Sequence, residues 1–256
     1  MAWLVPVLAL VTWEILVDRQ IAPSRFLPAP SSVIQAFLRL LKSGELSTHL
    51  GISLQRAALG FLIGGSVGLL FGFINGLSRV SEVLFDSPIQ MIRTIPHLAL
   101  LPIVILWFGI GEESKVFLVA LGAVFPIYIN TFHGIRSIDP GLRELATVYQ
   151  IGRWKVFTEI VLPGALPSIL LGVRYALGIT WLTLIVAETI AARSGIGFMA
   201  MNAREFLETD VVVLSILLYA LFGKLADSIA RALERSFLQW HDSQLSVRRV
   251  GASGVS

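Results

Sequence analysis

The sequence predicts an all-α integral membrane protein with about six transmembrane helices. Hydrophobic residues make up 55% of the chain and charged residues only 14%, whereas soluble domains have roughly 45–50% and 25%. The apolar residues fall into blocks close to the ~20 residues that a helix needs to cross a ~30 Å hydrocarbon core. Runs such as 98–108 and 211–218 do not alternate between apolar and polar positions, which excludes the strands of a membrane barrel.

Six blocks are expected to span the membrane, over residues 2–17, 52–77, 88–110, 116–133, 166–192 and 211–230. Residues 1–256 then form a single transmembrane domain with a large loop at about 135–167 and a tail at about 231–256. The first block is open to a second interpretation as a signal peptide. No basic residue precedes it and no clear small-x-small cleavage site follows it, so a span is favoured.

Basic residues near the ends of the spans predict the orientation, because they gather on the cytoplasmic side. Four lie in the loop after the fourth block, and a fifth lies just inside the next block: Arg136, Arg143, Arg153, Lys155 and Arg174. Four more lie in the tail: Arg231, Arg235, Arg248 and Arg249. Loop and tail are therefore expected in the cytoplasm, together with the N-terminus. Segments 18–51, 111–115 and 193–210 are expected outside, although Arg19, Arg25, Arg39 and Lys42 in the first of them run against the rule.

Glycines recur every four residues in the second block, at Gly60, Gly64, Gly68, Gly72 and Gly76. This spacing places small residues along one face of a helix, where a neighbouring helix can approach closely in lipid. Packing within the chain is the favoured interpretation, and a seam between two copies is the alternative.

Two short helices are expected on the outer side. Residues 31–41 follow Pro28-Ala29-Pro30 and carry Val33, Ala36, Phe37, Leu40 and Leu41 on one face, which is typical of an interfacial helix; a contact for another protein is the alternative. The turn Ser194-Gly195-Ile196-Gly197 before residues 199–206 predicts a helix that dips back at the outer mouth.

The loop at 135–167 predicts a helical hairpin at the membrane surface. Asp139-Pro140 is typical of an N-cap with proline at the first helical position, and Glu144 favours the same helix start. Leu142, Leu145, Ala146 and Tyr149 then share one face. The helix is expected to break near Gly152, and a second piece over 154–162 is expected to end at Pro163. The hairpin either rests on lipid headgroups or docks a soluble partner.

These residues resemble the Glu-Ala-Ala loop of permeases from binding-protein-dependent ABC importers. Glu144, Ala146, Ile160, Leu162 and Pro163 match the family pattern, and Leu145 replaces its middle alanine. The family's glycine falls at Gln150, and Gly152 follows two residues later. The resemblance implies the type I importer permease fold, with residues 144–163 forming a coupling helix that docks on a cytoplasmic ATPase.

Further segments are similar to the branch of permeases that imports aliphatic sulfonates, taurine and nitrate, with the sulfonate permeases the most alike. They include Pro96-His97-Leu98-Ala99-Leu100, Ala187-Glu188-Thr189-Ile190 and Met201-Asn202-Ala203-Arg204-Glu205-Phe206. The resemblance implies a multi-pass protein of the bacterial inner membrane that pairs with a second copy, two ATPases and a periplasmic or lipid-anchored binding protein, and moves its substrate by alternating access.

Other classes of function are less well supported. A secondary transporter would commonly contain an internal repeat, and none is evident. The four histidines, His49, His97, His133 and His241, are not spaced as metal ligands, and cysteine is absent. No Walker A sequence is present, so we expect no catalytic residue, metal or cofactor in this chain, with ATP and Mg²⁺ held by the partner ATPase. The net charge of +3 gives no reason to expect nucleic acid.

Polar residues at membrane depth are costly and often mark a transport path. The candidates are Arg93, His97, Arg174, Thr180, Thr183 and Glu188, with Asn202 and Arg204 at the outer turn. Arg93 and Arg174 also lie where their charges can reach the inner surface, and Glu188 can instead pair with Arg193 or Arg204. An anion would favour helix N-termini and arginines along the path.

Overall fold

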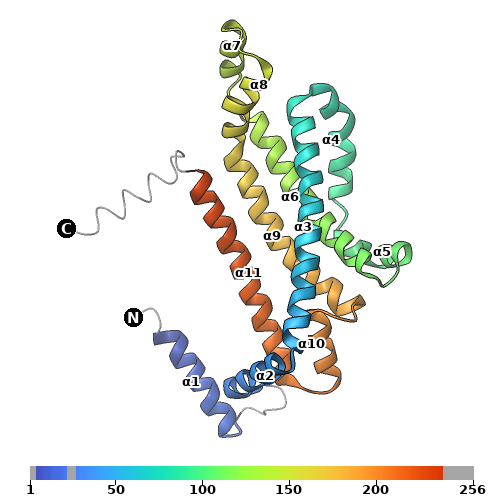
Figure 1. Ribbon diagram of the computed structural model, residues 1–256, viewed down its shortest axis with the longest axis vertical. Helices are drawn as coiled ribbons and strands as arrows, with labels where there is room; N and C mark the ends of the chain where they lie inside the picture. Colours follow the sequence, from blue (N-terminus) through green and yellow to red (C-terminus); the bar gives the residue numbers. More distant parts are fainter. Residues whose placement is uncertain (1–3, 22–26, 239–256) are drawn as a thin grey trace, which may run out of the picture.

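The computed structural model describes residues 4–21 and 27–238, which are helical almost throughout (Figure 1). Arg25, His241, Arg248 and Arg249, and the part of the predicted tail after residue 238, lie outside these residues. The helices are α1 (Leu4–Asp18), α2 (Pro30–Ser43), α3 (Glu45–Leu77), α4 (Arg79–Arg93), the 3-10 turn η1 (His97–Leu100), α5 (Leu101–Phe108), α6 (Glu112–Arg136), α7 (Pro140–Val148), α8 (Arg153–Val156), the π-helical turn η2 (Phe157–Val161), α9 (Leu162–Ala191), α10 (Ile196–Glu205) and α11 (Thr209–Phe237).

Each of the six apolar blocks is helical, but they differ in their capacity to span a bilayer. Within the described residues, four helices are long and apolar enough to cross a membrane: α3, α6, the continuous run from α8 to α9, and α11. The third predicted block is a bent pair, in which the helices on either side of residues 94–96 meet at 80°, and it makes a fifth span if the pair is counted as one. The first block is α1, which has only 15 residues.

The long helices lie side by side, with short helices at both of their ends and with α4 and α5 along one side (Figure 1). The hairpin of α7 and α8 lies at one end, near the start of α4, and α2 and α10 lie at the other. This separation agrees with the predicted topology, in which the 135–167 loop and the outer helices face different compartments. The outer helix α2 packs its buried residues Val33, Ala36 and Leu40 against α10 and α11, so protein covers that face.

The glycine stripe of α3 packs against α6. A Cβ added at Gly64 would lie 2.1 Å from the carbonyl oxygen of Ala120, and one at Gly68 would lie 2.5 Å from that of Val124. Gly60, Gly72 and Gly76 are similarly close to α6 side chains. Because lipid supplies no hydrophobic force between helices, such close contact is what holds them together. The stripe is therefore an internal contact, as favoured from the sequence.

The helix after the hairpin turn does not end at Pro163, and that prediction was wrong. The chain stays helical from Arg153 to Ala191, a run of 39 residues. Proline interrupts an α-helix because it lacks an N–H group and clashes with the carbonyl four residues earlier. Here the π-helical turn η2 ends at Val161, two residues before Pro163, and such a turn already interrupts the regular α-helical hydrogen-bond pattern.

Candidate functional site

The first limb of the predicted hairpin is α7, and its start is the one expected from Asp139-Pro140. The Asp139 carboxylate accepts a hydrogen bond from the Gly141 backbone N–H at 2.8 Å, and Pro140 occupies the first helical position. These two residues satisfy one free backbone donor and remove another. They fix where α7 begins, four residues after the end of α6 at Arg136.

The turn after α7 is centred on Gln150. This residue has a φ of +52°, in the left-handed region that glycine adopts most easily. The Gln150 N–H donates to the Thr147 carbonyl at 3.1 Å and the Ile151 N–H to the Ala146 carbonyl at 2.9 Å, which is the Schellman pattern that ends many helices with a glycine. The turn therefore lies at Gln150, two residues before Gly152, near which the sequence predicted the break. Gly152 has an ordinary φ of −58°.

The outer surface of the hairpin is unusually apolar for a polar loop. Large apolar side chains are exposed at Leu142, Leu145, Val148, Tyr149 and Trp154, and Glu144 is exposed among them. Ala146, by contrast, is only 3% exposed. The predicted stripe of Leu142, Leu145, Ala146 and Tyr149 is therefore split, because Ala146 faces the rest of the protein while the other three face outward.

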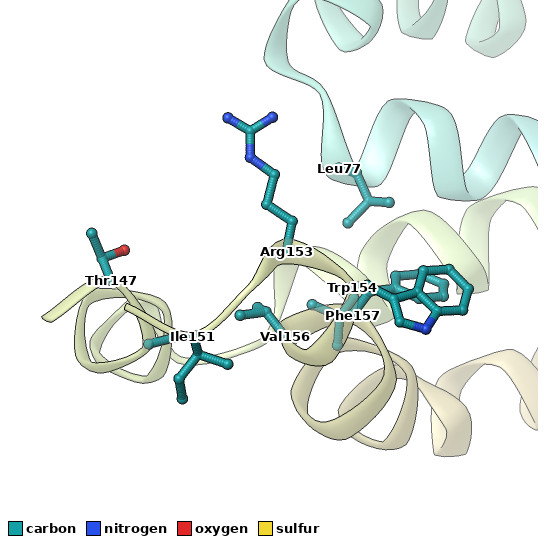
Figure 2. Close-up of a pocket in the computed structure, with 9 residues that line it drawn as sticks. Leu77, Thr147, Ile151, Arg153, Trp154, Val156 and Phe157 are labelled. Carbon is teal, nitrogen blue, oxygen red and sulfur yellow. The ribbon is translucent and has the colours of Figure 1, made fainter. Parts of the chain in front are cut away.

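A pocket of about 940 Å³ opens between the two limbs of the hairpin (Figure 2). Its walls come from α7, the turn, α8 and η2, with Leu77 from the end of α3. The Trp154 and Phe157 rings stack at 5.8 Å between their centroids and form one side of the pocket (Figure 2). Ala146 lines it as well, so the hairpin offers both a raised apolar surface and a hollow beside it.

The second group of family-matched residues supports the hairpin from within. Ile160 and Leu162 pack against a buried cluster of Ile135, Ile138, Val161, Ala165 and Ile169, which joins the end of α6 to the start of α9. Pro163 is the second residue of α9, in the same region. These residues hold the hairpin on the bundle, and its docking role stays a prediction.

A buried ionic network lies at the opposite end of the bundle. All five N–H donors of the Arg56 guanidinium are used: two bind Glu112, one binds Glu188, and two bind the carbonyl and hydroxyl of Ser194. The Arg56 and Glu188 side chains are almost fully buried, whereas Glu112 is 60% exposed. Lys115 lies 3.7 Å from Glu112, so two positive and two negative groups balance one another.

Glu188 also fixes the start of α10. Its carboxylate accepts hydrogen bonds from the Gly197 N–H at 2.9 Å and the Ser53 hydroxyl at 2.8 Å, and Ser53 in turn accepts from the Ile196 N–H at 2.9 Å. A Cβ at Gly195, which has a φ of +106°, would lie 2.4 Å from the carboxylate. The α10 turn is therefore shaped around Glu188, and α10 is anchored to α3 and α9. The expected partners of Glu188, Arg193 and Arg204, are not the ones that bind it.

The structure brings together two of the predicted path residues. His97 Nε2 lies 2.8 Å from Thr183 Oγ1, and Gly122 leaves room for the contact, since a Cβ there would lie 3.0 Å from the threonine oxygen.

The other candidates for the transport path are dispersed. Arg93 is exposed at the bend, Asn202 and Arg204 are exposed on α10, and Thr180 is buried in α9. Arg174 binds Asp227 at 2.9 Å and is an interhelical contact between α9 and α11.

Sequence reasoning missed the network around Arg56. The signal was present, because an arginine in the interior of an apolar block marks a functional or structural site by default. Arg56 was overlooked because it lies only four residues after the predicted start of the second span, at residue 52. In the structure α3 begins earlier, at Glu45, which places Arg56 well inside the helix.

Comparisons with known proteins agree with this architecture. Residues 59–239 match the family described as the binding-protein-dependent transport system inner membrane component. The chain is 59% identical over 239 residues to the putative aliphatic sulfonates transport permease protein SsuC of Escherichia coli K12, covering 93% of this chain and 91% of the relative. It is 37% identical over 240 residues to the taurine transport system permease protein TauC of the same organism, covering 92% and 87%.

The fold is also similar to that of a solved transporter. An inward-facing structure of the MetNI methionine ABC transporter matches with a TM-score of 0.56 at 19% sequence identity, covering 71% of this chain and 92% of that one. This likeness concerns the fold alone. The family match and the identity to the curated permeases show more. The chain is a multi-pass subunit of an ABC importer and belongs to the inner membrane components of binding-protein-dependent transport systems.

Proposed function

We propose that this permease carries an aliphatic sulfonate into the cytoplasm. The observation that supports this substrate most strongly is the 59% identity to a sulfonate permease along nearly the whole chain, compared with 37% to a taurine permease. Taurine is itself a small sulfonate, so it remains the first alternative, followed by nitrate.

The working assembly contains two copies of this chain, two ATPase subunits and a binding protein. ATP and Mg²⁺ bind to the ATPases, because this chain has no Walker A sequence to hold them. The apolar residues Leu142, Leu145 and Tyr149 of the hairpin dock on the ATPase, with Glu144 beside them. Exposed apolar side chains of this kind mark a contact surface when they gather on one face, and the Schellman turn at Gln150 holds this face in a fixed shape.

The transport path is proposed to pass the bend between α4 and α5. His97 and Thr183 meet there, at the break in a helix pair, which is the kind of place where polar groups face a cavity in membrane transporters. An anion from the binding protein would enter near α10, where Asn202 and Arg204 are exposed. Weak contacts along this path suit a subunit that must release its substrate to the cytoplasm.

Growth on different nutrients tests the substrate. A strain that lacks its own sulfonate and taurine permeases, but keeps the matching ATPase and binding protein, should regain growth on an alkanesulfonate as sole sulfur source when this chain is supplied. Growth on sulfate is the control, and nitrate uptake should not change. Growth restored only on taurine, or a change in nitrate uptake alone, would transfer the assignment to the corresponding alternative.

A further inference from the structure

Two rows of side chains face each other where α4 lies beside α6. On α6, Tyr128, Phe132 and Arg136 are spaced by four residues and share one face. On α4, Glu82 and Asp86 have the same spacing. The Tyr128 hydroxyl donates to Asp86 Oδ1 at 2.7 Å, and Arg136 forms an ion pair with Glu82. These five residues are called the α4–α6 bridge.

The α4–α6 bridge is continuous along the helix. The Tyr128 and Phe132 rings stack at 6.0 Å between their centroids, and the Arg136 guanidinium lies 5.8 Å from the centre of the Phe132 ring. Asn75 of α3 connects the two ends, since its side-chain N–H₂ donates to Tyr128 Oη at 2.9 Å and its backbone carbonyl accepts from Arg136 at 3.4 Å. The asparagine is fully buried.

The two ends of the bridge differ in how easily they can open. Breaking the bond between Tyr128 and Asp86 would leave the hydroxyl proton of Tyr128, a side chain that is only 1% exposed, without an acceptor, which is costly. Arg136 and Glu82 are each 32% exposed, so water can replace either partner. The Tyr128–Asp86 end is therefore a fixed pivot, and the Arg136–Glu82 end can change.

The α4–α6 bridge also lies between the α7–α8 hairpin and the bend beside His97. Arg136 is the last residue of α6, and Asp139, the N-cap of α7, follows three residues later. Glu82 is in the first turn of α4, and α4 leads to the bend at residues 94–96 and to His97. A displacement of α7 reaches Arg136 over a very short stretch of chain.

We propose that Arg136 and Glu82 transmit the displacement of α7 to α4, and through α4 to the bend beside His97. Both act as positioning residues, because neither touches the substrate. This inference rests on the proposed function, in that it assumes an ATPase docked on α7. A purely structural role would make the same ion pair necessary for stability, yet unnecessary for converting ATP hydrolysis into transport.

Charge reversal in the assembled complex separates these roles. The complex with its ATPase and binding protein is reconstituted in vesicles, and alkanesulfonate uptake is measured per ATP hydrolysed. Arg136→Glu and Glu82→Arg are each expected to lower this ratio roughly tenfold, and the double variant is expected to recover it to within about twofold, as for two directly coupled residues. Glu82→Gln, a milder change, should lower the ratio less. Arg79→Glu is the matched control, because Arg79 is exposed at the start of α4, and it should leave the ratio unchanged.

A second readout does not depend on the substrate. The chain contains no cysteine, so a single Leu106→Cys on α5, where the side chain is exposed, can report movement beyond the bend through its rate of maleimide labelling. In the otherwise unchanged complex this rate should differ with and without ATP and vanadate. In either charge reversal that difference should disappear, and in the double variant it should return.

The outcomes separate this inference from the proposed function. If uptake of alkanesulfonate fails but the labelling difference follows the predicted pattern, the substrate is wrong and transmission through the pair stands. Single reversals with normal ratios and normal labelling would overturn the inference. So would a double variant that stays as impaired as the single ones, or reversals that prevent the ATPase from co-purifying.

Discussion

Arg56 Nη1 donates to Glu188 Oε1 across 2.8 Å in a pair from which water is almost entirely excluded. Removing one partner of such a pair leaves an uncompensated charge, which typically costs about 3–5 kcal/mol. Glu188→Ala should therefore lower the free energy of unfolding in detergent by about 3 kcal/mol or more. Glu112→Gln, on the exposed side of Arg56, should cost much less. Equal losses for the two variants would contradict the assignment of Glu188 as the anchor of α10.

The glycine stripe makes a prediction about a single methyl group. Gly64→Ala places a Cβ 2.1 Å from the Ala120 carbonyl oxygen of α6, and this overlap with backbone cannot be relieved by rotating a side chain. We expect the free energy of unfolding to fall by about 3 kcal/mol, which is at the upper end of the usual cost of overpacking. Gly51→Ala is the control in the same helix, because a Cβ there meets nothing within 4 Å. Thermal unfolding in detergent measures both, and similar midpoints would show that α3 and α6 do not pack as described.

The turn of the hairpin can be tested at two neighbouring positions. Gln150→Gly should keep the turn and stabilise it by about 0.5–1 kcal/mol, because glycine adopts a positive φ without strain. Gln150→Val should impair ATPase binding, since a β-branched residue fits that conformation poorly. Gly152→Ala should be tolerated, as its φ is ordinary and the space around it is open. Co-purification of the ATPase is the measurement, and the opposite ranking of Gln150→Gly and Gln150→Val would place the turn elsewhere.

The docking surface predicts a loss of partner binding without a loss of folding. Leu145→Asp, alone or with Glu144→Arg, should sharply reduce recovery of the ATPase with the permease, while the thermal midpoint of the permease stays unchanged because both side chains are exposed. Ala146→Asp is a poorer test than the sequence suggests, since Ala146 is buried and a charge there disturbs the hairpin itself. Undiminished recovery with Leu145→Asp would remove this surface from the contact.

Reporter fusions test the orientation. A reporter joined after Arg153 should be active only in the cytoplasm, and one joined after Arg193 only on the outer side, since α9 carries the chain across the membrane between them. Alkaline phosphatase is active only outside the cytoplasm. It should therefore be inactive when fused after Arg153 and active when fused after Arg193. The reverse result would put the hairpin in the wrong compartment for an ATPase.

The sequence was sufficient for the features that depend on local chemistry. Composition and block length predicted the membrane helices, the four-residue glycine spacing predicted close packing of that helix within the chain, and Asp139-Pro140 predicted the start of α7. Features that depend on partners far apart in the chain were missed. Arg56 and Glu188 are 132 residues apart, and nothing local indicates that they meet. The continuation through Pro163 was missed for a different reason, because a π-helical turn has no recognised sequence signal.

The continuous helix from Arg153 to Ala191 fixes the distance between its two ends as well as connecting them. At 1.5 Å per residue its 39 residues extend for about 58 Å, nearly twice the ~30 Å thickness of the hydrocarbon core. The helix is therefore long enough to extend beyond the hydrocarbon core on the side of the hairpin. A cytoplasmic protein bound to the hairpin would contact one end of a helix that crosses the whole hydrocarbon core. A tilt of that end would therefore also move the other end, on the far side of the membrane.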